Sequence, residues 1–466
     1  MTSSPRVPGQ PALGLLVLLV LGAAWSLDRT VVSSAPDPAR LFQARTAADW
    51  SESDLGRLAA WSRETTVLRG RLVRINSDSF QTLKTSAWSE TITLNLFDDL
   101  VLTAVHERLE KAPLNRVLWF GRLKGEDRGQ VIMVLDQGNL TAVISRPGGL
   151  YEVRPLTGGT HVIREIDQSK FEREAPARPA PPPDNKAAGL DSRIESTVTI
   201  DVAVAYTQDA AADSGNIAND IILAVADANQ AYVNSGINQR LNLVDTKQVN
   251  YAESGDVCVD LDRLRDSADG DMDDLHDWRD SVGADCLVLM VKNGSGYVGC
   301  AYQMSVVDDY FAAWAFSVVR LGAATANHTF AHELGHNMGA RHDCDQDALD
   351  TPYVYAHGYL DPNHAWRTIM AYASSFNETR IPYFSNPDLL YGGEPLGEAS
   401  GACQADNRGV LNNTASTVAA FRTSTGGASP SASSGGGGGS GDSGGGGGGG
   451  CFIQAAQPDR SVLKKP

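Results

Sequence analysis

The sequence predicts an α/β (α+β) domain over residues 197–423, preceded by a β-rich region over residues 27–173. Within the first region, apolar and polar residues alternate in short runs with Gly and Asp in the gaps, which is typical of antiparallel strands. Within the second region, strand-like runs alternate with segments of helical spacing, which favours a mixed sheet flanked by helices. A Pro-rich stretch at 174–186 separates the two regions.

Local patterns predict the elements in chain order. After an initial helical part, the β-rich region is expected to form short strands at 91–97, 117–120, 131–135, 140–144 and 150–153. The second region is expected to open with a strand at 198–206 and a helix at 217–234 that stops at Gly236. It is then expected to continue with a strand at 241–244, a helix around 261–281, and strands at 286–291 and 313–319.

The linker and the two ends differ from these regions in composition. Residues 174–196 are expected to be a stiff, exposed linker and activation region, because proline disfavours helix and central strand. Residues 424–466 are Gly/Ser-rich with a terminal Cys-Phe-Ile segment, and are expected to be a disordered tail. The poly-Gly run before Cys451 resembles bacterial C-terminal tails, which favours a bacterial source and leaves surface association open.

Residues 1–26 have the pattern of a cleaved signal peptide. Arg6 precedes the apolar run 12–21, and the small residues Ala24 and Ser26 suit signal peptidase. An uncleaved anchor is the alternative, but the apolar core is about half of the roughly 20 residues that a span needs. We therefore expect a secreted protein without a transmembrane span in the mature chain.

Charge and cysteine content narrow the function classes. The net charge of −17 argues against nucleic acid as a partner, since phosphate binding needs a basic surface. Nothing in the sequence demands an oligomer, and a monomer is expected. The chain has six cysteines, none of them before Cys258. Export makes disulfides feasible, although spacing alone does not give their pairing.

One segment carries the chemistry: His332, Glu333, His336, Gly339 and His342 match H-E-x-x-H-x-x-G-x-x-H. Residues four apart lie on one helix face, so the first two histidines can bind one ion. Gly339 can adopt a positive φ and turn the chain so that His342 returns as a third ligand. Three neutral imidazoles with one open position suit catalytic Zn²⁺.

Glu333 lies between the two helical histidines and is expected to act as the general base. It would take a proton from water and later return it to the leaving amine. A structural zinc site is the alternative, since Cys344 is close by and structural sites are usually closed by Cys or His. A catalytically inactive binding or adhesion module and a metal-dependent amidase acting on a non-peptide substrate also remain open.

The motif resembles that of the metzincin clan of zinc endopeptidases. The segment 368–372 resembles the clan's methionine turn, which implies that Met370 packs beneath the metal without binding it. Asp343 is similar to the adamalysin (reprolysin) branch, whereas Tyr372 is similar to astacins and serralysins, in which such a tyrosine contacts the metal or the reaction oxyanion. The combination resembles bacterial reprolysin-like and peptidyl-Asp metallopeptidases, and implies a twisted mixed sheet with a long metal-binding helix.

The same resemblance implies how a polypeptide substrate is held. The run Gly296, Tyr297, Val298 and Gly299, continuing to residue 302, resembles the clan's edge strand, and strand addition is a general way to bind a peptide. Cleavage before acidic residues is implied, and it requires a cation in the pocket to offset desolvation of the carboxylate. Arg380 is the first candidate for that cation and Arg367 the second, and the alternative is that both are solvated surface arginines.

Residues 27–173 resemble, more weakly, reprolysin propeptides. A propeptide thiolate on zinc is ruled out, because no cysteine precedes position 258. A carboxylate on zinc, a segment lying in the cleft as a false substrate, and a folding aid alone all remain open. The mature N-terminus is expected between about 175 and 200, in the exposed linker.

An acidic segment resembles a calcium loop only in part. Asp269, Asp271, Asp273 and Asp280 have calcium-loop spacing, but position six is Asp274 instead of Gly. A solvated acidic helix start is favoured, and a calcium requirement remains an alternative.

Overall fold

The computed structural model describes residues 40–43, 50–85, 87–88, 90–181 and 197–424. The expected signal peptide, most of the expected activation region and the Gly-rich tail with Cys451 lie outside the described residues. Within the described ranges, no helix is both long and apolar enough to cross a membrane.

The N-terminal region is one antiparallel sheet of nine strands in the order β1-β2-β9-β8-β7-β6-β5-β4-β3. The predicted meander is confirmed, since each strand from β3 to β9 pairs with the next along the chain. The strands are β1 Phe42–Gln43, β2 Val67–Ile75, β3 Thr91–Phe97, β4 Leu100–Ala112, β5 Arg116–Leu123, β6 Gln130–Asp136, β7 Asn139–Arg146, β8 Gly149–Pro155 and β9 Thr160–Ile166. Two helices, α1 Glu52–Trp61 and α2 Ser77–Thr85, accompany them, with 3-10 turns η2 Thr157–Gly159 and η3 Gln168–Lys170.

The C-terminal region contains a mixed six-stranded sheet in the order β10-β14-β15-β13-β11-β12. β15, β13, β11 and β12 are parallel, and β14 runs antiparallel to β15. The strands are β10 Arg178–Pro179, β11 Thr199–Thr207, β12 Arg240–Val249, β13 Cys286–Val291, β14 Gly299–Gln303 and β15 Phe316–Arg320. The central strand β13 is buried at every position, as parallel sheets covered on both faces require.

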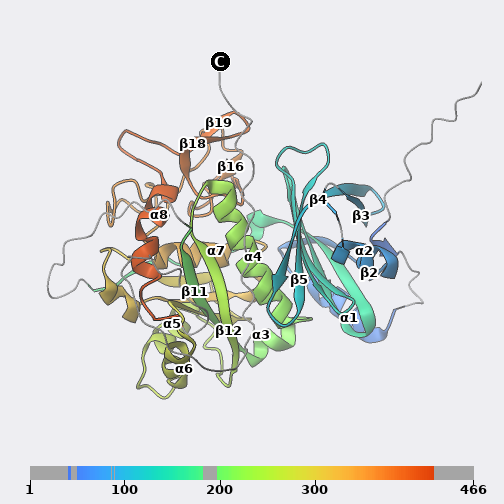
Figure 1. Cartoon of the computed structure of the whole chain (residues 1–466), viewed down its shortest axis with the longest axis horizontal. Helices are drawn as coiled ribbons and strands as arrows, with labels where there is room; N and C mark the ends of the chain where they lie inside the picture. Colours follow the sequence, from blue (N-terminus) through green and yellow to red (C-terminus); the bar gives the residue numbers. More distant parts are fainter. Residues whose placement is uncertain (1–39, 44–49, 86, 89, 182–196, 425–466) are drawn as a thin grey trace, which may run out of the picture. The chain divides into compact units, whose positions relative to one another are not determined.

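Helices cover this sheet, and in Figure 1 α4 runs alongside β11 and β12. The helices are α3 Gln208–Asp213, α4 Ile217–Ser235, α5 Val257–Arg265, α6 Asp274–Val282, α7 Thr329–Asn337 and α8 Asn407–Val418, with 3-10 turns η4 Asp309–Ala313 and η5 Leu321–Ala323. Asn216 caps the start of α4, and Gly236 ends it in the left-handed conformation, as predicted.

Two predicted elements differ from the structure. The single helix expected around 261–281 is two helices, because α5 ends at an extended Asp266 and the loop that follows needs positive φ at Gly270 and Met272. The strand expected at 313–319 begins only at Phe316, because η4 extends to Ala313 and Trp314 caps it.

Beyond α7 the chain forms two small ladders and carries one of the two disulfides found among the described residues. The ladders pair β16 Trp366–Arg367 with β17 Thr379–Arg380, and β18 Asn386–Tyr391 with β19 Glu394–Leu396. Cys344 bonds Cys403, while Cys258 bonds Cys300 and so ties α5 to β14.

The N-terminal sheet and α4 share a hydrophobic cluster. Ile222 and Leu223 of α4 pack with Ile132 and Val134 of β6, all of them buried. Next to this cluster, Arg154 of β8 pairs with both Glu152 and Asp220, and all three side chains are nearly or fully buried. The two regions are therefore attached by apolar burial and by a desolvated ion network.

The expectation of an exposed linker is wrong for its first part. Glu174, Ala175 and Ala180 are buried, and β10 pairs with β14 in parallel. The prolines prevent this segment from forming a helix, but a strand at the edge of a sheet tolerates proline. The residues next to the prolines still donate their main-chain N–H groups to β14. Ala175 N donates to Gly299 O at 2.9 Å and Ala180 N donates to Gln303 O at 3.3 Å.

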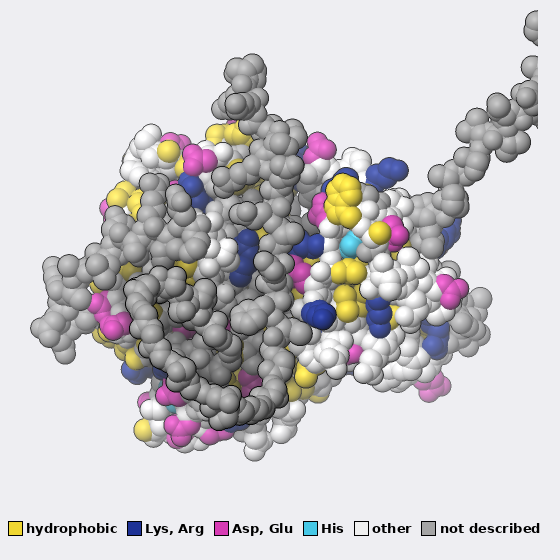
Figure 2. All heavy atoms as spheres, in the orientation of Figure 1, with side chains coloured by type: hydrophobic (Ala, Val, Ile, Leu, Met, Phe, Trp, Pro, Cys, Tyr) yellow, Lys and Arg dark blue, Asp and Glu magenta, His cyan; other side chains and the backbone are white. Residues whose placement is uncertain are grey.

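Charged side chains of both signs are interspersed on the face of the molecule drawn in Figure 2, although the residues not described cover part of that view. This mixture is typical of a soluble surface.

Candidate metal centre

Three histidines converge at the predicted motif. The Nε2 atoms of His332, His336 and His342 lie 3.0–3.1 Å from one another, and all three side chains are buried. Tetrahedral Zn²⁺ with Zn–N bonds of about 2.0–2.1 Å places its nitrogens about 3.3 Å apart, so the cluster fits that ion. Within the described part of the chain, this is the only group of His, Cys, Asp or Glu side chains whose ligand atoms lie close enough together to hold a metal ion.

The helix that carries two of these histidines is short. The expected long metal-binding helix is wrong, because α7 spans nine residues. His328 precedes it with φ 53°, in the left-handed region, and Met338 already departs from helical geometry after it. Gly339 then adopts φ 91° and allows the turn that leads to His342, as the sequence predicted.

Main-chain oxygens orient the imidazoles. His332 Nδ1 donates to Ile369 O at 2.8 Å, and His336 Nδ1 lies 2.9 Å from Ala340 O and 3.0 Å from Gln303 Oε1. When the proton is on Nδ1, Nε2 has a free lone pair that points toward the centre of the cluster. Burial lowers the pKa of His332 to about 4, and burial also lowers the pKa of His336 and His342 well below its usual range. The three imidazoles are therefore neutral near pH 7, which is the form in which histidine binds a metal.

Glu333 projects beside this cluster. Both carboxylate oxygens are buried and have no hydrogen-bond partner within the described residues. Burial raises the pKa of this carboxyl well above its usual range. A Cβ atom on Gly299 would lie 2.2 Å from Glu333 Oε1, so β14 needs a glycine there to give the carboxylate room. An unpartnered buried carboxylate of this kind is suited to receive a proton from water.

Met370 and Asp343 connect the histidine motif with the methionine turn. A Cβ atom on Gly335 would lie 2.7 Å from Met370 Sδ, so the methionine side chain packs against α7 between the two helical histidines. Asp343 Oδ2 accepts the main-chain N–H of Tyr372 at 3.0 Å, which ties the end of the histidine motif to the methionine turn.

Tyr372 lies against His342, with ring centroids 4.0 Å apart. Its hydroxyl donates to Glu174 O and Ala175 O, at 2.7 and 3.0 Å. Burial raises the pKa of the phenol, which therefore stays a donor at neutral pH.

The two candidate arginines differ in their partners. The Arg380 guanidinium is buried and pairs with the Glu174 carboxylate through both Nη atoms, and the Nη2–Oε2 distance is 2.9 Å. Arg367 is also buried, but it donates to the main-chain oxygens of Glu378 and Ala371. Burial, followed by the charge of Arg380, lowers the pKa of Arg367 to about 9. Arg380 is the guanidinium that holds a carboxylate.

The expected edge strand begins later than predicted. Gly296, Tyr297 and Val298 lie in the loop before β14, and Gly296 has φ 79°. Only the part from Gly299 onward is strand, and its outer edge is covered by residues 173–180. β14 lies beside the site as expected for this strand, but β10 pairs with its outer side, so the edge is occupied in this form of the chain.

Sequence reasoning did not identify three further residues at the site. Glu174, Asn327 and Thr329 are all buried, and both of the last two donate to Glu174 Oε1, at 3.0 and 2.9 Å. The only available signal was that Asn327 and Thr329 immediately precede the motif. Nothing local marked Glu174, which lies more than 150 residues away from both.

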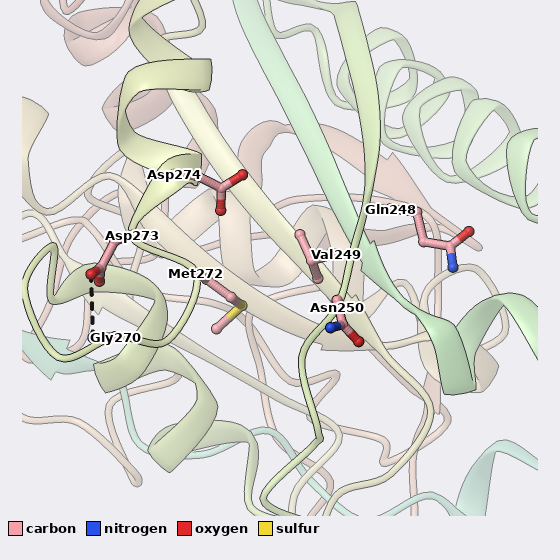
Figure 3. A pocket seen from close by; sticks show the side chains of 7 residues that line it. All are labelled: Gln248, Val249, Asn250, Gly270, Met272, Asp273 and Asp274. Carbon is pink, nitrogen blue, oxygen red and sulfur yellow. Dashed lines mark hydrogen bonds between the residues drawn. The ribbon is translucent and has the colours of Figure 1, made fainter.

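The acidic loop does not gather its carboxylates. Asp269 and Asp273 accept main-chain N–H groups within the loop, and Asp271 pairs with Arg263 at 3.4 Å. The loop instead borders a hollow of about 350 Å³ that is lined by Gln248, Val249, Asn250, Gly270, Met272, Asp273 and Asp274. Figure 3 shows this hollow and the hydrogen bond from Gly270 to Asp273. Nothing at this loop supports a calcium site.

Comparisons with known proteins agree with this geometry. Residues 196–385 match the model of metallo-peptidase family M12. The chain is 36% identical over 419 residues to the Peptidyl-Asp metalloendopeptidase of Stenotrophomonas maltophilia (strain R551-3), which covers 84% of this chain and 96% of that protein. It is 33% identical over 429 residues to the protein of the same name from Xanthomonas campestris pv. campestris, over 88% of this chain and 98% of that protein.

Among solved structures, metalloproteinase-II from Bacteroides fragilis matches with a TM-score of 0.41 at 16% identity, over 67% of this chain and 92% of that chain. The relatives in sequence are aligned over almost their whole length, well beyond the histidine motif. The chain therefore belongs to the M12 metallopeptidases, as a zinc metalloendopeptidase of the group that contains the bacterial Peptidyl-Asp metalloendopeptidases.

Proposed function

We propose that this zinc endopeptidase is exported by a bacterium as a monomeric proenzyme and, once processed, cleaves polypeptides before acidic residues. The observation that carries the substrate preference is the buried Arg380 guanidinium, which lies at the site and is paired with a carboxylate. The names of the relatives support the same preference.

His332, His336 and His342 would hold the zinc through Nε2. Bound there, zinc polarises the scissile carbonyl and lowers the pKa of a coordinated water. The mutual distances of the three nitrogens and the absence of any described partner for Glu333 support this assignment. Gly339, Asp343 and Met370 would position the histidines and would not react.

Glu333 would accept a proton from water at a carboxylate oxygen and deliver it to the nitrogen of the leaving amine. Gly299 keeps the space that this movement needs. Tyr372 would donate its hydroxyl to a carbonyl oxygen of the bound chain, and its contacts with the oxygens of Glu174 and Ala175 support that role.

Substrate would add to the edge of β14 as an extended strand. Its acidic side chain would enter the pocket formed by Arg380, Asn327 and Thr329. A carboxylate leaves water at a considerable cost unless a cation and hydrogen-bond donors replace the solvent, and these three side chains supply both. An amide or apolar side chain would leave Arg380 without its partner charge, so the pocket would discriminate against it.

Residues 27–173 would be the propeptide, and cleavage between about 175 and 200 would break its covalent link to the protease domain. The Gly-rich tail would act as a spacer at the cell surface. Sequencing the N-terminus of the secreted protein tests the first point. An active form that keeps residues 30–170 would make that region a permanent second domain.

Replacing Glu333 with Gln tests the mechanism. The variant should retain about one zinc per chain and lose on the order of 10²–10⁴ in kcat, because it removes the base but no ligand. Mass spectrometry of products from a denatured protein mixture should show acidic residues after the cut. Substantial activity in the variant would contradict the role of Glu333, and a flat cleavage profile would contradict the substrate preference.

A further inference from the structure

We infer that Glu174 is an internal ligand of the acidic-side-chain pocket, and that residues 172–180 keep the proenzyme latent by occupying the place of substrate on β14. This inference rests on the proposed function in one respect, namely that Arg380 is the residue that selects acidic substrates.

The pocket is complete around the Glu174 carboxylate. Arg380 donates from both Nη atoms, and Asn327 Nδ2 and Thr329 Oγ1 donate to Oε1 at 3.0 and 2.9 Å. The Glu174 side chain is fully buried and that of Arg380 is 1% exposed. All three donors belong to the protease domain and the carboxylate belongs to the segment before it. The protease domain therefore binds the Glu174 carboxylate as it would bind the acidic side chain of a substrate.

The main chain of the same segment covers the binding edge. Val298 N donates to Arg173 O at 3.1 Å, and Ala175 N donates to Gly299 O at 2.9 Å. Farther along, Ala180 N donates to Gln303 O at 3.3 Å. These bonds use the edge groups from Val298 to Gln303 that an incoming peptide would need. Substrate and this segment therefore cannot bind together.

The segment is held without being presented for hydrolysis. If the pocket selects the residue after the scissile bond, the bond at risk is Arg173–Glu174. Its carbonyl oxygen accepts the amide of Val298, which belongs to the loop before β14. The next two carbonyl oxygens accept the Tyr372 hydroxyl. A carbonyl engaged in this way is not free to be polarised, which explains how a substrate-like segment stays uncut.

A nearby residue provides a matched control. Glu172 lies two positions before Glu174 and pairs with Arg320 at 2.8 Å, but its side chain is 47% exposed. The variant Glu172→Gln makes the same chemical change in the same segment outside the pocket. An effect of lost charge alone would appear in both variants, whereas an effect of the pocket appears only at Glu174.

The first experiment measures how firmly residues 172–180, here called the latch, are held on β14, and it needs no activity assay. Full-length chain carrying Glu333→Gln, which prevents self-cleavage, is followed by hydrogen–deuterium exchange with and without Glu174→Gln. We expect exchange across residues 172–180 and 298–303 to accelerate on the order of 100-fold, since a buried ion pair is broken. The Glu172→Gln chain should match the parent, and Glu174→Asp should fall between the two. If Glu174→Gln does not fold, the comparison of Glu174→Asp with Glu172→Gln decides the question.

The second experiment measures latency in the zinc-loaded, full-length chain with active Glu333. Unprocessed Glu174→Gln should hydrolyse a fluorogenic peptide at least tenfold faster than the unprocessed parent, while Glu172→Gln stays latent. A Glu174→Gln chain that is as protected and as latent as the parent overturns the inference.

Cleavage profiling of the processed parent separates the two proposals. A processed enzyme that selects acidic residues, with a Glu174→Gln proenzyme that remains latent, overturns the latch alone. A processed enzyme without acidic preference overturns the proposed substrate class and the pocket assignment with it.

Discussion

Replacing Arg380 in the processed enzyme should abolish its preference for acidic substrates. In the proenzyme this guanidinium is 1% exposed and meets a fully buried carboxylate, so screening by solvent does not reduce the interaction. Removing one partner of such a pair typically costs about 3–5 kcal/mol, which corresponds to a fall of roughly 150- to 5,000-fold in kcat/KM. Arg380→Gln should show a loss of this size for acidic substrates.

The assay compares two peptides that differ only in Asp or Asn after the scissile bond. The parent should strongly prefer Asp, and Arg380→Gln should bring the ratio of the two kcat/KM values close to one. Arg380→Lys keeps the charge but loses the bidentate geometry. Its kcat/KM for the Asp peptide should therefore fall about 10- to 150-fold, the range expected from one charged hydrogen bond.

Arg367→Lys is the control, because Arg367 donates to main-chain oxygens of Glu378 and Ala371 and should leave the Asp-to-Asn ratio unchanged. The reasoning would be refuted if Arg380→Gln kept the parent ratio. It would also be refuted if cleavage of the Asn peptide fell as far as that of the Asp peptide, since the defect would then lie in the metal centre.

Three further predictions concern the base, the disulfide and the proenzyme interface. Gly299→Ala should lower kcat on the order of 100-fold while zinc content is retained, because the added Cβ would lie 2.2 Å from Glu333 Oε1; unchanged turnover would contradict the close approach. Replacing Cys258 and Cys300 with Ser should lower the free energy of unfolding, measured with urea, by about 4 kcal/mol, since the disulfide spans 42 residues. A decrease below about 1 kcal/mol would show that α5 and β14 stay packed together without the disulfide. Burial raises the pKa of Glu152, but Arg154 and Arg164 outweigh it and lower that pKa from 4.5 to about 2. The ionised carboxylate therefore contributes about 3 kcal/mol to the free energy of unfolding; this contribution is complete above pH 4.5 and is lost as the pH falls toward 2. The corresponding Glu152→Gln proenzyme should show a flatter dependence of unfolding free energy on pH in that window.

The sequence predicted those parts of the site that depend on local spacing. His332 and His336 share a helix face because they are four residues apart, and Gly339 adopts the positive φ that brings His342 back. The strands of the N-terminal sheet were found from short apolar runs between Gly and Asp residues, although the central strands are buried on both faces instead of alternating. These features need no knowledge of distant residues.

Other features depend on contacts between distant residues, and the sequence pattern did not contain them. Glu174 and Arg380 are 206 positions apart, and each looks like an ordinary surface charge in its own segment. Composition also misled at 174–180, where prolines suggested exposure although Glu174, Ala175 and Ala180 are buried. Arg367 and Arg380 could be ranked but not separated, because the difference lies in which one meets a carboxylate.

The position of the latch has a consequence for activation. Every residue of the N-terminal segment that holds the cleft closed lies at or before Ala180, whereas most of the window expected for the mature N-terminus, about 175 to 200, lies after it. A cut after Ala180 removes the covalent tether and its high effective concentration, but it breaks none of the contacts to Arg380 or β14. The N-terminal region also stays attached through α4, where Ile222 and Leu223 are buried against its sheet. A chain cut after Ala180 is therefore expected to remain a non-covalent inhibited complex. Full activity then requires dissociation of that complex or a further cut before Glu174. Where dissociation is the route, we expect the buried α4 interface, and not the first cleavage, to limit the rate of activation.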